Sequence, residues 1–577
     1  MKRYGKYIKP YLFSFIVGPL LMIVEVLGEV VLPKLMAGII NNGVANHDIP
    51  YITRTGLVMI AFAFLMMAGG IGGAYFGAKA SIGFAADLRR DAFANIQKFS
   101  FANIDKYSTG SLVTRITNDV TQVQNLVNMM LRMMLRAPGM LIGAVIMAFA
   151  INASLARIIV IIIPIMIVVI AIVISIAFPR FRILQSKIDG LNSGIRESLT
   201  NVRVIKSFVR DDFEQKRFEA SNEDLYNASM RAFKVMITTW PLMGLFMNVT
   251  TLAIVWYGGN QVIAGGMEIG DLTAFITYVT QILFALMMTS MIILQSSRAV
   301  ASAKRINEVL DQKTDIDDSE AAEPSKKVES GSIEFKNVTF RYYKNSEDPV
   351  LDSIDLKIAS GETVGIIGST GSGKSTLVQM IPRLYDPDAG EVLVDGVNVK
   401  DYSLKNLRDG VSMVLQKNVL FSGSIMENLQ WGDEEADQNS IEEAAKMAEA
   451  HGFVSSFAEG YETDLGQGGV NVSGGQKQRL CIARAMLKKP KILILDDSTS
   501  AVDTATESKI RASLKSALPD TTKLIIAQRI SSIIEADKIV VLDDGRIVGY
   551  GNHAELMENC EAYKEIYYSQ MDKEVGA

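Results

Sequence analysis

Long apolar stretches dominate the first three hundred residues and constrain the fold of this chain more than any other feature. Six of them are long and apolar enough to cross about 30 Å of hydrocarbon. They lie near residues 11–40, 55–80, 131–151, 156–178, 236–258 and 272–296. Because backbone polar groups inside a bilayer must be satisfied within the segment, we expect six membrane-spanning helices rather than one water-soluble core.

Charges in the connecting loops predict which ends of the spans face the cytosol. Loops 41–53, 151–156 and 258–271 contain no Lys or Arg, whereas the longer loops 80–130 and 179–235 are rich in both. Positive residues are retained on the cytosolic side, so both termini and the two long loops are expected there. Apolar residues recur at spacings of three and four in the long loops, so the spanning helices are expected to continue into the cytosol. These features predict a multi-pass protein of the cytoplasmic membrane.

Several side chains within the predicted spans are candidates for a substrate cavity. Glu25 and Glu29 lie four residues apart on one helix face, and carboxylates inside a membrane normally face a bundle interior or a wet cavity. They could form a cation or proton site, contact a substrate, or make a structural hydrogen-bonding pair. Thioethers and aromatic rings in the last two spans suit a promiscuous apolar pocket, although each of them could equally pack against helices or lipid. These residues are Trp240, Met243, Phe246, Met247, Phe284, Met287, Met288 and Met291.

The remainder of the chain has the composition of a soluble α/β domain. Residues 311–330 are polar and charged without an apolar period, which predicts a linker, and strand-like stretches begin directly after them. The formal net charge is −5, so the composition gives no reason to expect nucleic acid as a partner. The two cysteines, Cys481 and Cys560, both lie in this half, which favours a reducing cytosolic setting over a disulfide framework.

The stretch GIIGSTGSGKSTLVQMI (365–381) predicts a strand, a glycine-rich turn and a helix. Its glycines, lysine and serine have the spacing of a phosphate-binding loop. Backbone N–H groups of such a loop wrap the phosphates, the lysine reaches the β- and γ-phosphates, and the serine hydroxyl binds Mg²⁺. The ATP-binding residues predicted here are Gly368, Ser369, Thr370, Gly371, Ser372, Gly373, Lys374, Ser375 and Thr376.

A second motif, ILILDD, ends a buried strand in two adjacent carboxylates, Asp496 and Asp497. A phosphate-loop ATPase needs an acid at the end of a neighbouring strand to hold Mg²⁺, and Asp496 fits this role. The alternative, that Asp496 only caps the following helix, is the weaker interpretation. We therefore expect Mg-ATP as the ligand of this half of the chain.

The stretch NVSGGQKQRLCIARAMLKKPKILILDD (471–497) resembles the signature region of ATP-binding cassette (ABC) proteins. Other motifs follow in the order of that family: Tyr342 resembles the aromatic that stacks on adenine, Gln416 the glutamine that contacts Mg²⁺, and Asp503 the aspartate that crosses the dimer interface. The signature residues are Ser473, Gly474, Gly475 and Gln476. The metal ligands that the resemblance implies are Ser375, Gln416 and Asp496.

Further motifs extend the resemblance over essentially the whole chain. YSTGSLVTRITND (107–119) and ESLTNVRVIKSF (197–208) in the long loops are similar to motifs of ABC exporters, as is TDLGQGG (463–469) before the signature. Gln467 stands where this last motif usually has Glu. Six spans before a single cassette resemble a half-transporter of the ABC exporter type.

The resemblance implies a fold, cofactors and an assembly. We expect a helical six-span transmembrane domain over residues 1–310, a linker over 311–330 and an α/β P-loop ATP-binding cassette over 331–577. ATP and Mg²⁺ are the implied cofactors. Cassettes of this family dimerise head to tail, so each ATP would lie between one chain's phosphate loop and the other chain's signature.

Two positions depart from the family pattern at the same chemical centre. The residue after the Mg²⁺ aspartate is usually a glutamate that polarises the attacking water, and Asp497 is one methylene shorter. On the same backbone its oxygens lie roughly 1.5 Å short, whereas a base must come within about 3 Å of the proton; such a misplacement can cost on the order of a hundredfold. Gln528 stands where the family has a histidine, and glutamine cannot carry a proton or a positive charge. We therefore predict a site that binds Mg-ATP and hydrolyses it poorly, the alternative being a slow but working ATPase.

With this site impaired and the signature intact, the sequence resembles the degenerate-site subunit of a heterodimeric multidrug exporter. The implied partner is a second, non-identical half-transporter with the consensus glutamate and histidine. The predicted function is ATP-driven export of apolar or amphiphilic compounds across the cytoplasmic membrane. A lipid or peptide exporter is the alternative within transport. An ATP-gated channel or regulator is disfavoured because the linker has no room for a long regulatory insert.

Overall fold

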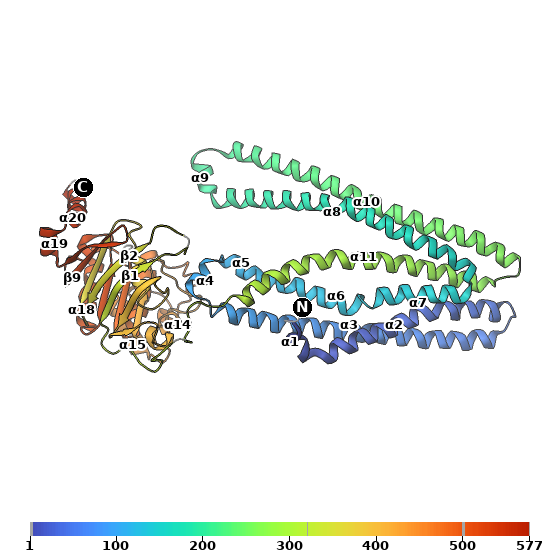
Figure 1. The fold of residues 1–577 in the computed structure, drawn as a ribbon, viewed down its shortest axis with the longest axis horizontal. Coiled ribbons are helices and arrows are strands. Elements are labelled where there is room, and N and C mark those ends of the chain that lie inside the picture. The colour runs from blue at the N-terminus through green and yellow to red at the C-terminus, as the bar shows by residue number, and fades with distance from the viewer. Residues whose placement is uncertain (1–3, 320, 345, 499–501, 576–577) are drawn as a thin grey trace. The chain divides into compact units, whose positions relative to one another are not determined.

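A computed structural model describes most of the chain as two compact units (Figure 1). The first comprises Met1–Gln97 and Thr109–Asp311, and the second comprises Lys98–Ser108 and Gln312–Ala577. The structure describes residues 4–575 except 320, 345 and 499–501, and it does not describe the side chains of 240, 290–298 and 571–575.

The first unit is built from long helices that run side by side (Figure 1). The principal helices are α2 (Leu12–Gly38), α3 (Ile49–Ile96), α6 (Val120–Met133), α7 (Arg136–Ile151), α8 (Ala153–Thr200), α10 (Asp211–Ile263) and α11 (Ile269–Asp311). Shorter turns join them: α1 (Gly5–Ile8), η2 (Lys9–Tyr11), η3 (Ile39–Val44), α5 (Thr109–Thr114), η4 (Arg115–Asp119) and α9 (Val202–Ser207).

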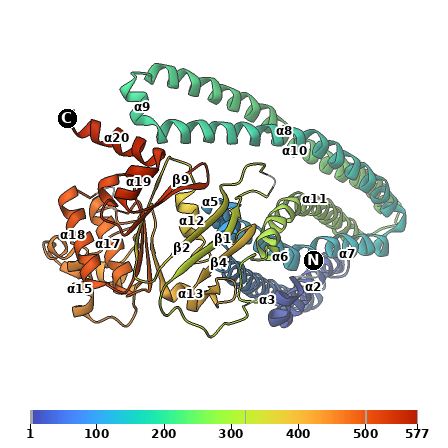
Figure 2. The ribbon, with the colours of Figure 1, turned by 60° about the vertical axis from the view of Figure 1, so that its left-hand side comes forward.

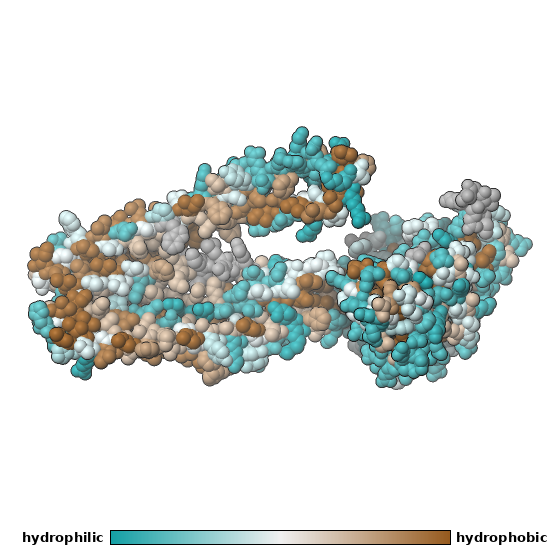
Figure 3. Space-filling view, turned by 180° about the vertical axis from the view of Figure 1, so that it is seen from behind, coloured by the Kyte–Doolittle hydropathy of each residue, from teal (hydrophilic) through white to brown (hydrophobic). Residues whose placement is uncertain are grey.

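Six helical segments in the described part of this unit are long and apolar enough to cross a membrane, as predicted. They are Gly5–Val44, Ile49–Ile96, Thr109–Ile151, Ala153–Thr200, Asp211–Ile263 and Ile269–Thr289. On the face shown in Figure 3, apolar side chains gather on these helices, whereas most of the cassette surface is polar, and the α9 end of α8 and α10 carries side chains of both kinds. Exposed residues such as Phe64, Ile161 and Leu252 are therefore suited to contact lipid.

Close packing of α2 against α3 depends on small residues. A Cβ added to Gly69 would lie 2.9 Å from the carbonyl oxygen of Leu21, and one added to Gly73 would lie 3.2 Å from that of Gly18. Small residues let two helix backbones approach closely inside a membrane, where van der Waals packing replaces the hydrophobic effect as the driving force. The buried Tyr278 of α11 fixes its own helix to α2, because its hydroxyl donates a 2.7 Å hydrogen bond to the carbonyl oxygen of Val30.

The second unit contains two sheets. An antiparallel sheet has the strand order β2-β1-β4-β5, and a mostly parallel sheet has the order β10-β9-β3-β8-β7-β6. The strands are β1 (Ile333–Phe340), β2 (Leu351–Ile358), β3 (Thr363–Gly368), β4 (Ala389–Val394), β5 (Val397–Asn398), β6 (Val411–Val414), β7 (Ile492–Asp496), β8 (Thr522–Ile526), β9 (Lys538–Asp543) and β10 (Arg546–Gly551). The six spans and this α/β cassette confirm the predicted fold class.

Helices pack around the parallel sheet, with α15, α17 and α18 together at one end of the cassette and β1, β2 and β4 at the other (Figure 2). The helices are α12 (Lys374–Gln379), α13 (Leu404–Gly410), α14 (Ile425–Gln430), α15 (Gln438–Met447), α16 (His451–Val454), α17 (Gly474–Leu487), α18 (Thr504–Ala517), α19 (His553–Asn559) and α20 (Glu561–Val575), with the 3-10 turns η5 (Gly460–Glu462) and η6 (Ile530–Ser532). Every residue of β7 and β8 is buried, as expected for parallel strands covered on both faces.

One segment of the first long loop, Lys98–Ser108, belongs to the cassette unit and carries α4 (Phe101–Asp105). Asn103 donates a 2.7 Å hydrogen bond to the carboxylate of Asp315. Tyr385 of the cassette donates a 2.6 Å hydrogen bond to Asp105. A stretch that lies more than two hundred residues before the cassette in the sequence therefore forms part of its surface.

The segment between α11 and β1 is also attached to the cassette. The described residues between Gln312 and Ser332 form neither helix nor strand. Asp395 nevertheless accepts hydrogen bonds from four consecutive backbone N–H groups, those of Glu329, Ser330, Gly331 and Ser332. Val328 is 7% exposed and packs in the core of the antiparallel sheet. The polar composition of this segment gave no indication that hydrogen bonds to Asp395 and burial of Val328 attach it to the cassette.

Candidate nucleotide-binding site

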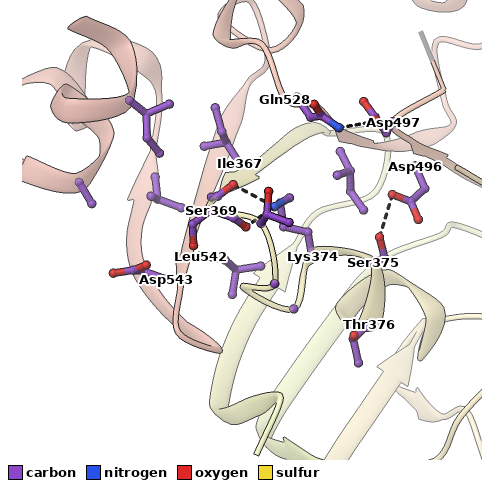
Figure 4. Close-up of a pocket in the computed structure, with 18 of the residues that line it drawn as sticks. Ile367, Ser369, Lys374, Ser375, Thr376, Asp496, Asp497, Gln528, Leu542 and Asp543 are labelled. Atoms are coloured by element: carbon purple, nitrogen blue, oxygen red, sulfur yellow. Dashed lines mark hydrogen bonds between the residues drawn. The ribbon is translucent and has the colours of Figure 1, made fainter. Parts of the chain in front are cut away.

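A pocket of about 810 Å³ opens at the carboxyl ends of the parallel strands β3, β7 and β8 (Figure 4). Ligands of open α/β sheets bind at this edge, and the volume is that of a small-molecule cleft. The structure brings together here most of the residues that the sequence predicted for ATP. The pocket is lined by Tyr342, Gly368, Ser369, Thr370, Gly371, Gly373, Lys374, Ser375, Thr376, Gln416, Asp496, Asp497 and Gln528.

The glycine-rich loop has a backbone that other residues would not tolerate. Gly373 has φ +92°, and a Cβ there would lie 2.7 Å from the carbonyl oxygen of Val350. A Cβ on Gly368 would lie 2.0 Å from the carbonyl oxygen of Leu542. Only glycine combines the left-handed conformation with this close approach. The conformation of the loop at the pocket therefore depends on these two glycines.

Lys374 is the first residue of helix α12, and its side chain folds back over the loop. Its ammonium donates hydrogen bonds of 2.9 and 2.6 Å to the carbonyl oxygens of Gly368 and Ser369 (Figure 4). Burial lowers the pKa of Lys374, while the nearby carboxylates of Asp496 and Asp497 act in the opposite direction. The hydroxyl of Ser372 is buried without a hydrogen-bond partner among the described residues. A cation in a glycine-lined loop beside an unpartnered buried donor fits the phosphates of a nucleotide.

Ser375 and Asp496 form the part of the pocket that suits a divalent cation. The Ser375 hydroxyl donates a 3.0 Å hydrogen bond to Asp496. Burial raises the pKa of Asp496, and the neighbouring Asp497 raises it further against the effects of Ser375 and Lys374. Such a carboxylate gains most from a cation placed beside it. Hydroxyl and carboxylate oxygens are the ligands that Mg²⁺ prefers, and the Gln416 carboxamide lies at the same pocket.

The two residues that depart from the family pattern contact each other. The Gln528 side-chain amide donates a 2.7 Å hydrogen bond to a carboxylate oxygen of Asp497 (Figure 4). Asp497 is left-handed, with φ +48°, and its backbone is held by Ile526 and Gln478. Burial raises the pKa of Asp497, and hydrogen bonds from Gln528 and Gln416 partly offset this effect. The neighbour of the Asp497 carboxylate is therefore the Gln528 amide, which cannot take up a proton.

The predicted signature residues lie at the start of α17 and do not line this pocket. Ser473 and Gln476 form a reciprocal capping box: the Ser473 hydroxyl accepts from the Gln476 N–H, and the Gln476 side chain accepts from the Ser473 N–H. Gly474 and Gly475 form the first turn. Asp503 caps α18 by accepting from the N–H of Thr506 at 2.9 Å, and this bond lowers its pKa.

Tyr342 lies at the mouth of the pocket with 43% of its surface exposed. Its hydroxyl lies 2.9 Å from that of Thr376, and its ring meets Tyr385 edge-on at 5.2 Å. The sequence did not predict Tyr385 as a neighbour of the site, because this residue belongs to no recognised nucleotide-binding motif. It also missed the C-terminal helix α20, which contributes Glu565, Ile566 and Gln570 among others to the pocket wall.

Inside the membrane unit, Glu25 and Glu29 form an ion-paired cluster that the sequence did not predict. Arg136 of α7 lies 3.1 Å from a carboxylate oxygen of Glu25 and 2.7 Å from one of Glu29. Gln281 of α11 donates a 3.1 Å hydrogen bond to the backbone carbonyl of Glu29. Three helices therefore meet at one polar point. The position of Arg136 near the start of the predicted span 131–151 was the available signal.

The predicted apolar cavity residues have different surroundings. Met243 is 5% exposed and packs in the helical core, with Phe246 and Met287 partly buried against the same cluster. Phe284 and Met247 are exposed, and Met288 is half-buried. The side chains of Trp240 and Met291 lie outside the described residues. Some of these side chains are thus helix-packing residues, and others are free to meet lipid, a substrate or a second chain.

Comparison with known proteins gives the class. Residues 15–286 match the ABC transporter transmembrane region, and residues 351–500 match the family described as ABC transporter. A bacterial Atm1-family ABC exporter with ATP bound has a similar structure, with a TM-score of 0.78 and 25% identity over 97% of this chain and 98% of that one. The fold is that of an ABC exporter half-transporter, in which a membrane domain precedes a cassette.

Two relatives from Bacillus subtilis match this chain along its whole length. The uncharacterised ABC transporter ATP-binding protein YfiB is 40% identical over 574 residues, 100% of this chain and 99% of the relative. The putative multidrug export ATP-binding/permease protein YgaD is 33% identical over 99% of both chains. The chain therefore belongs to the ABC transporters, whose ATPase domain implies ATP binding and ATP-driven transport.

Proposed function

We propose that this chain is the ATP-holding half of a heterodimeric exporter in the cytoplasmic membrane. Its own site binds Mg-ATP and hydrolyses it poorly, and its signature completes the active site of a different half-transporter. The observation that carries the proposal is the contact between Asp497 and Gln528 at the place where the family has a base and a histidine.

The phosphate loop and the strand ends supply the binding functions. Lys374 would hold the β- and γ-phosphates, and the backbone N–H groups of the loop would surround them. Ser375, Gln416 and Asp496 would hold Mg²⁺, which neutralises charge on the phosphates when it is bound. Tyr342 would stack on adenine. None of these roles depends on the two altered positions, so we expect binding to be preserved.

Hydrolysis needs a base within reach of a water molecule that lies in line with the γ-phosphate. Asp497 is shorter than the usual glutamate, and one of its oxygens accepts the Gln528 amide. Gln528 can donate to a phosphate oxygen, but it cannot carry the positive charge of a histidinium. Among the described residues, no histidine lines the pocket. Slow cleavage follows from both features together.

The partner is expected to supply what this chain lacks. The signature of this chain is intact and begins a helix of 14 residues with a capping box. In a head-to-tail dimer it would meet the ATP bound to the partner's phosphate loop, where a consensus glutamate and histidine carry out hydrolysis. Closure of the cassettes can drive transport only through the higher affinity of ATP for the closed form. The altered site would keep its ATP longer and hold the dimer partly closed.

The substrate proposed is an apolar or amphiphilic compound. Relatives named as putative multidrug export proteins support this class, and so do the exposed Phe284 and Met247 in the last two spans. A lipid or peptide exporter is the second candidate. Vectorial movement of a fluorescent dye into proteoliposomes would support export, whereas ion conductance without such movement would favour a channel.

Affinity purification of the native complex, followed by ATPase assays, tests the assembly. A second, non-identical half-transporter should co-purify, and the purified chain alone should hydrolyse ATP weakly. Brisk turnover and transport by a complex containing only this chain would overturn the proposal.

A further inference from the structure

The C-terminal helix α20 (Glu561–Val575) contacts the segment that carries Gln528. The Gln570 side chain donates a 2.8 Å hydrogen bond from Nε2 to the backbone carbonyl of Gln528. Its Oε1 accepts a 2.8 Å hydrogen bond from the backbone N–H of Ile530. The Gln570 carboxamide therefore bridges two backbone groups on either side of Arg529. It pairs one donor and one acceptor with them, as the backbone of a neighbouring β-strand does.

The helix that carries Gln570 is itself anchored. Tyr563 is fully buried, and its hydroxyl lies 2.9 Å from Nδ1 of His553 on α19. Ile566 packs against the main core cluster of the cassette and also lines the nucleotide pocket. Gln570 lies one turn further along the same helix, so its position is set by this packing.

Gln528 is fixed at both ends by these contacts. Its backbone carbonyl is held by Gln570, and its side-chain amide donates to Asp497 in the pocket. Backbone hydrogen bonds set where a side chain begins, and small displacements at a reacting centre have large effects. A shift of α20 would therefore move the Gln528 amide relative to the phosphate.

We propose that Gln570 is a positioning residue that places Gln528 against the γ-phosphate, so that the C-terminal helix sets how long this site holds ATP. This inference rests on the proposed function, in which Gln528 faces the γ-phosphate. It adds a determinant that lies outside the phosphate loop, the signature and the acid-ended strand. Because the γ-phosphate is the only group that distinguishes ATP from ADP, the effect should be confined to ATP.

The test compares retention of a photoreactive azido-ATP and azido-ADP on this chain in the full-length transporter, purified with its native partner in lipid nanodiscs. Bound label is chased with unlabelled nucleotide, cross-linked at intervals and quantified on this chain after the chains are separated. Gln570→Ala should release azido-ATP about fivefold faster, the factor that corresponds to one net hydrogen bond of ordinary strength. Its release of azido-ADP should be unchanged.

Two further variants make the result specific. Glu561→Gln, at an 80% exposed side chain on the same helix, serves as a control and should behave as the unmodified chain. Gln528→Ala should also release azido-ATP faster, and adding Gln570→Ala to it should have little further effect, because residues that act through one another are not additive.

The outcomes separate the two proposals. If Gln528→Ala speeds ATP release but Gln570→Ala does not, the role of Gln570 is overturned while the proposed site stands. If Gln528→Ala leaves ATP retention unchanged, Gln528 does not hold the γ-phosphate and the inference fails, whereas the proposed site itself fails only if azido-ATP does not label this chain. Equal acceleration of ATP and ADP release in Gln570→Ala, or an additive effect in the double variant, would show a general loosening or a direct contact and would also overturn the inference.

Discussion

At the scale of single residues, the phosphate loop and the acid-ended strand have the geometry of a nucleotide site. Two side chains in it, Asp497 and Gln528, differ from the residues that the family uses for hydrolysis. Asp497 adopts a left-handed backbone that aspartate tolerates better than longer side chains do. Its carboxylate faces an amide instead of an imidazole. The phosphate loop and the Mg²⁺ ligands therefore serve binding, Asp497 bears on cleavage, and Gln528 bears on cleavage and on the retention of ATP.

Restoring the usual pair should restore hydrolysis. The double variant Asp497→Glu with Gln528→His is expected to raise nucleotide trapping by vanadate at this site at least about tenfold, because a positioned general base contributes a hundredfold or more. The longer side chain in a left-handed backbone should cost roughly 1 kcal/mol of stability. Trapping on this chain, compared with the unmodified transporter, measures the gain. No increase would mean that further residues disable the site.

Removing the loop cation should weaken binding at this chain alone. Lys374→Ala deletes the ammonium of the side chain that folds back over the loop, so azido-ATP labelling of this chain should fall by about tenfold or more, as expected for loss of a charge-assisted contact. The exposed Lys515→Ala on α18 is the matched control. Undiminished labelling of the Lys374 variant would exclude the assigned role.

At the scale of elements, α2, α7 and α11 of the membrane unit make close contacts around the charge cluster of Glu25, Glu29 and Arg136. Two carboxylates share one guanidinium. A hydrogen-bonded ion pair inside a membrane is costly to break because the remaining charge is left uncompensated. The cluster therefore acts first as a junction of three helices.

Neutralising Arg136 should destabilise this junction. Arg136→Gln leaves Glu25 and Glu29 without their cation and should cost on the order of 3 kcal/mol. The triple variant Glu25→Gln, Glu29→Gln and Arg136→Gln should recover most of the loss, because no buried charge remains unpaired. Thermal unfolding of the detergent-purified protein measures both. Full stability of Arg136→Gln would show that the ion pairs do not hold the helices together and would leave the carboxylates free for a substrate or a cation.

At the scale of the whole molecule, the cassette carries two separate regions that are expected to contact ATP, the phosphate-loop pocket and the signature. Its phosphate-loop pocket carries the altered pair, whereas its signature at the start of α17 does not line that pocket. In a head-to-tail dimer the two would serve different ATP molecules. A complete transporter would therefore respond differently to damage at each of them.

Variants of these two halves should have unequal effects on the native complex. On the proposed heterodimer, Gly475→Asp in the signature should abolish most ATPase activity, because it would add a carboxylate opposite the ATP at the partner's site. Lys374→Ala should leave part of the activity if, as proposed, this chain's own site contributes little turnover. Steady-state ATP hydrolysis by the two complexes makes the comparison. Equal losses would argue against unequal sites.

Features that depend on residues close together in the sequence could be predicted, whereas contacts between residues far apart in the sequence could not. The six spans and the phosphate loop are local patterns of apolar length and glycine spacing, and their elements were predictable. The partnership of Arg136 with Glu29 joins residues 107 positions apart, and no local pattern reports it. Gln570 contacts Gln528 across 42 positions from a helix that carries no motif. The roles of the predicted site residues remain predictions that the variants above address.

The attachment of residues 312–332 to the cassette has a mechanical consequence. Helix α11 ends at Asp311, and the cassette already bonds Asp315 through Asn103 and the chain at 329–332 through Asp395. Only three residues, 312–314, therefore separate the end of α11 from Asp315, which is hydrogen-bonded to Asn103 of the cassette unit. Because so short a segment cannot extend much, we expect a movement of the cassette to be transmitted directly to α11.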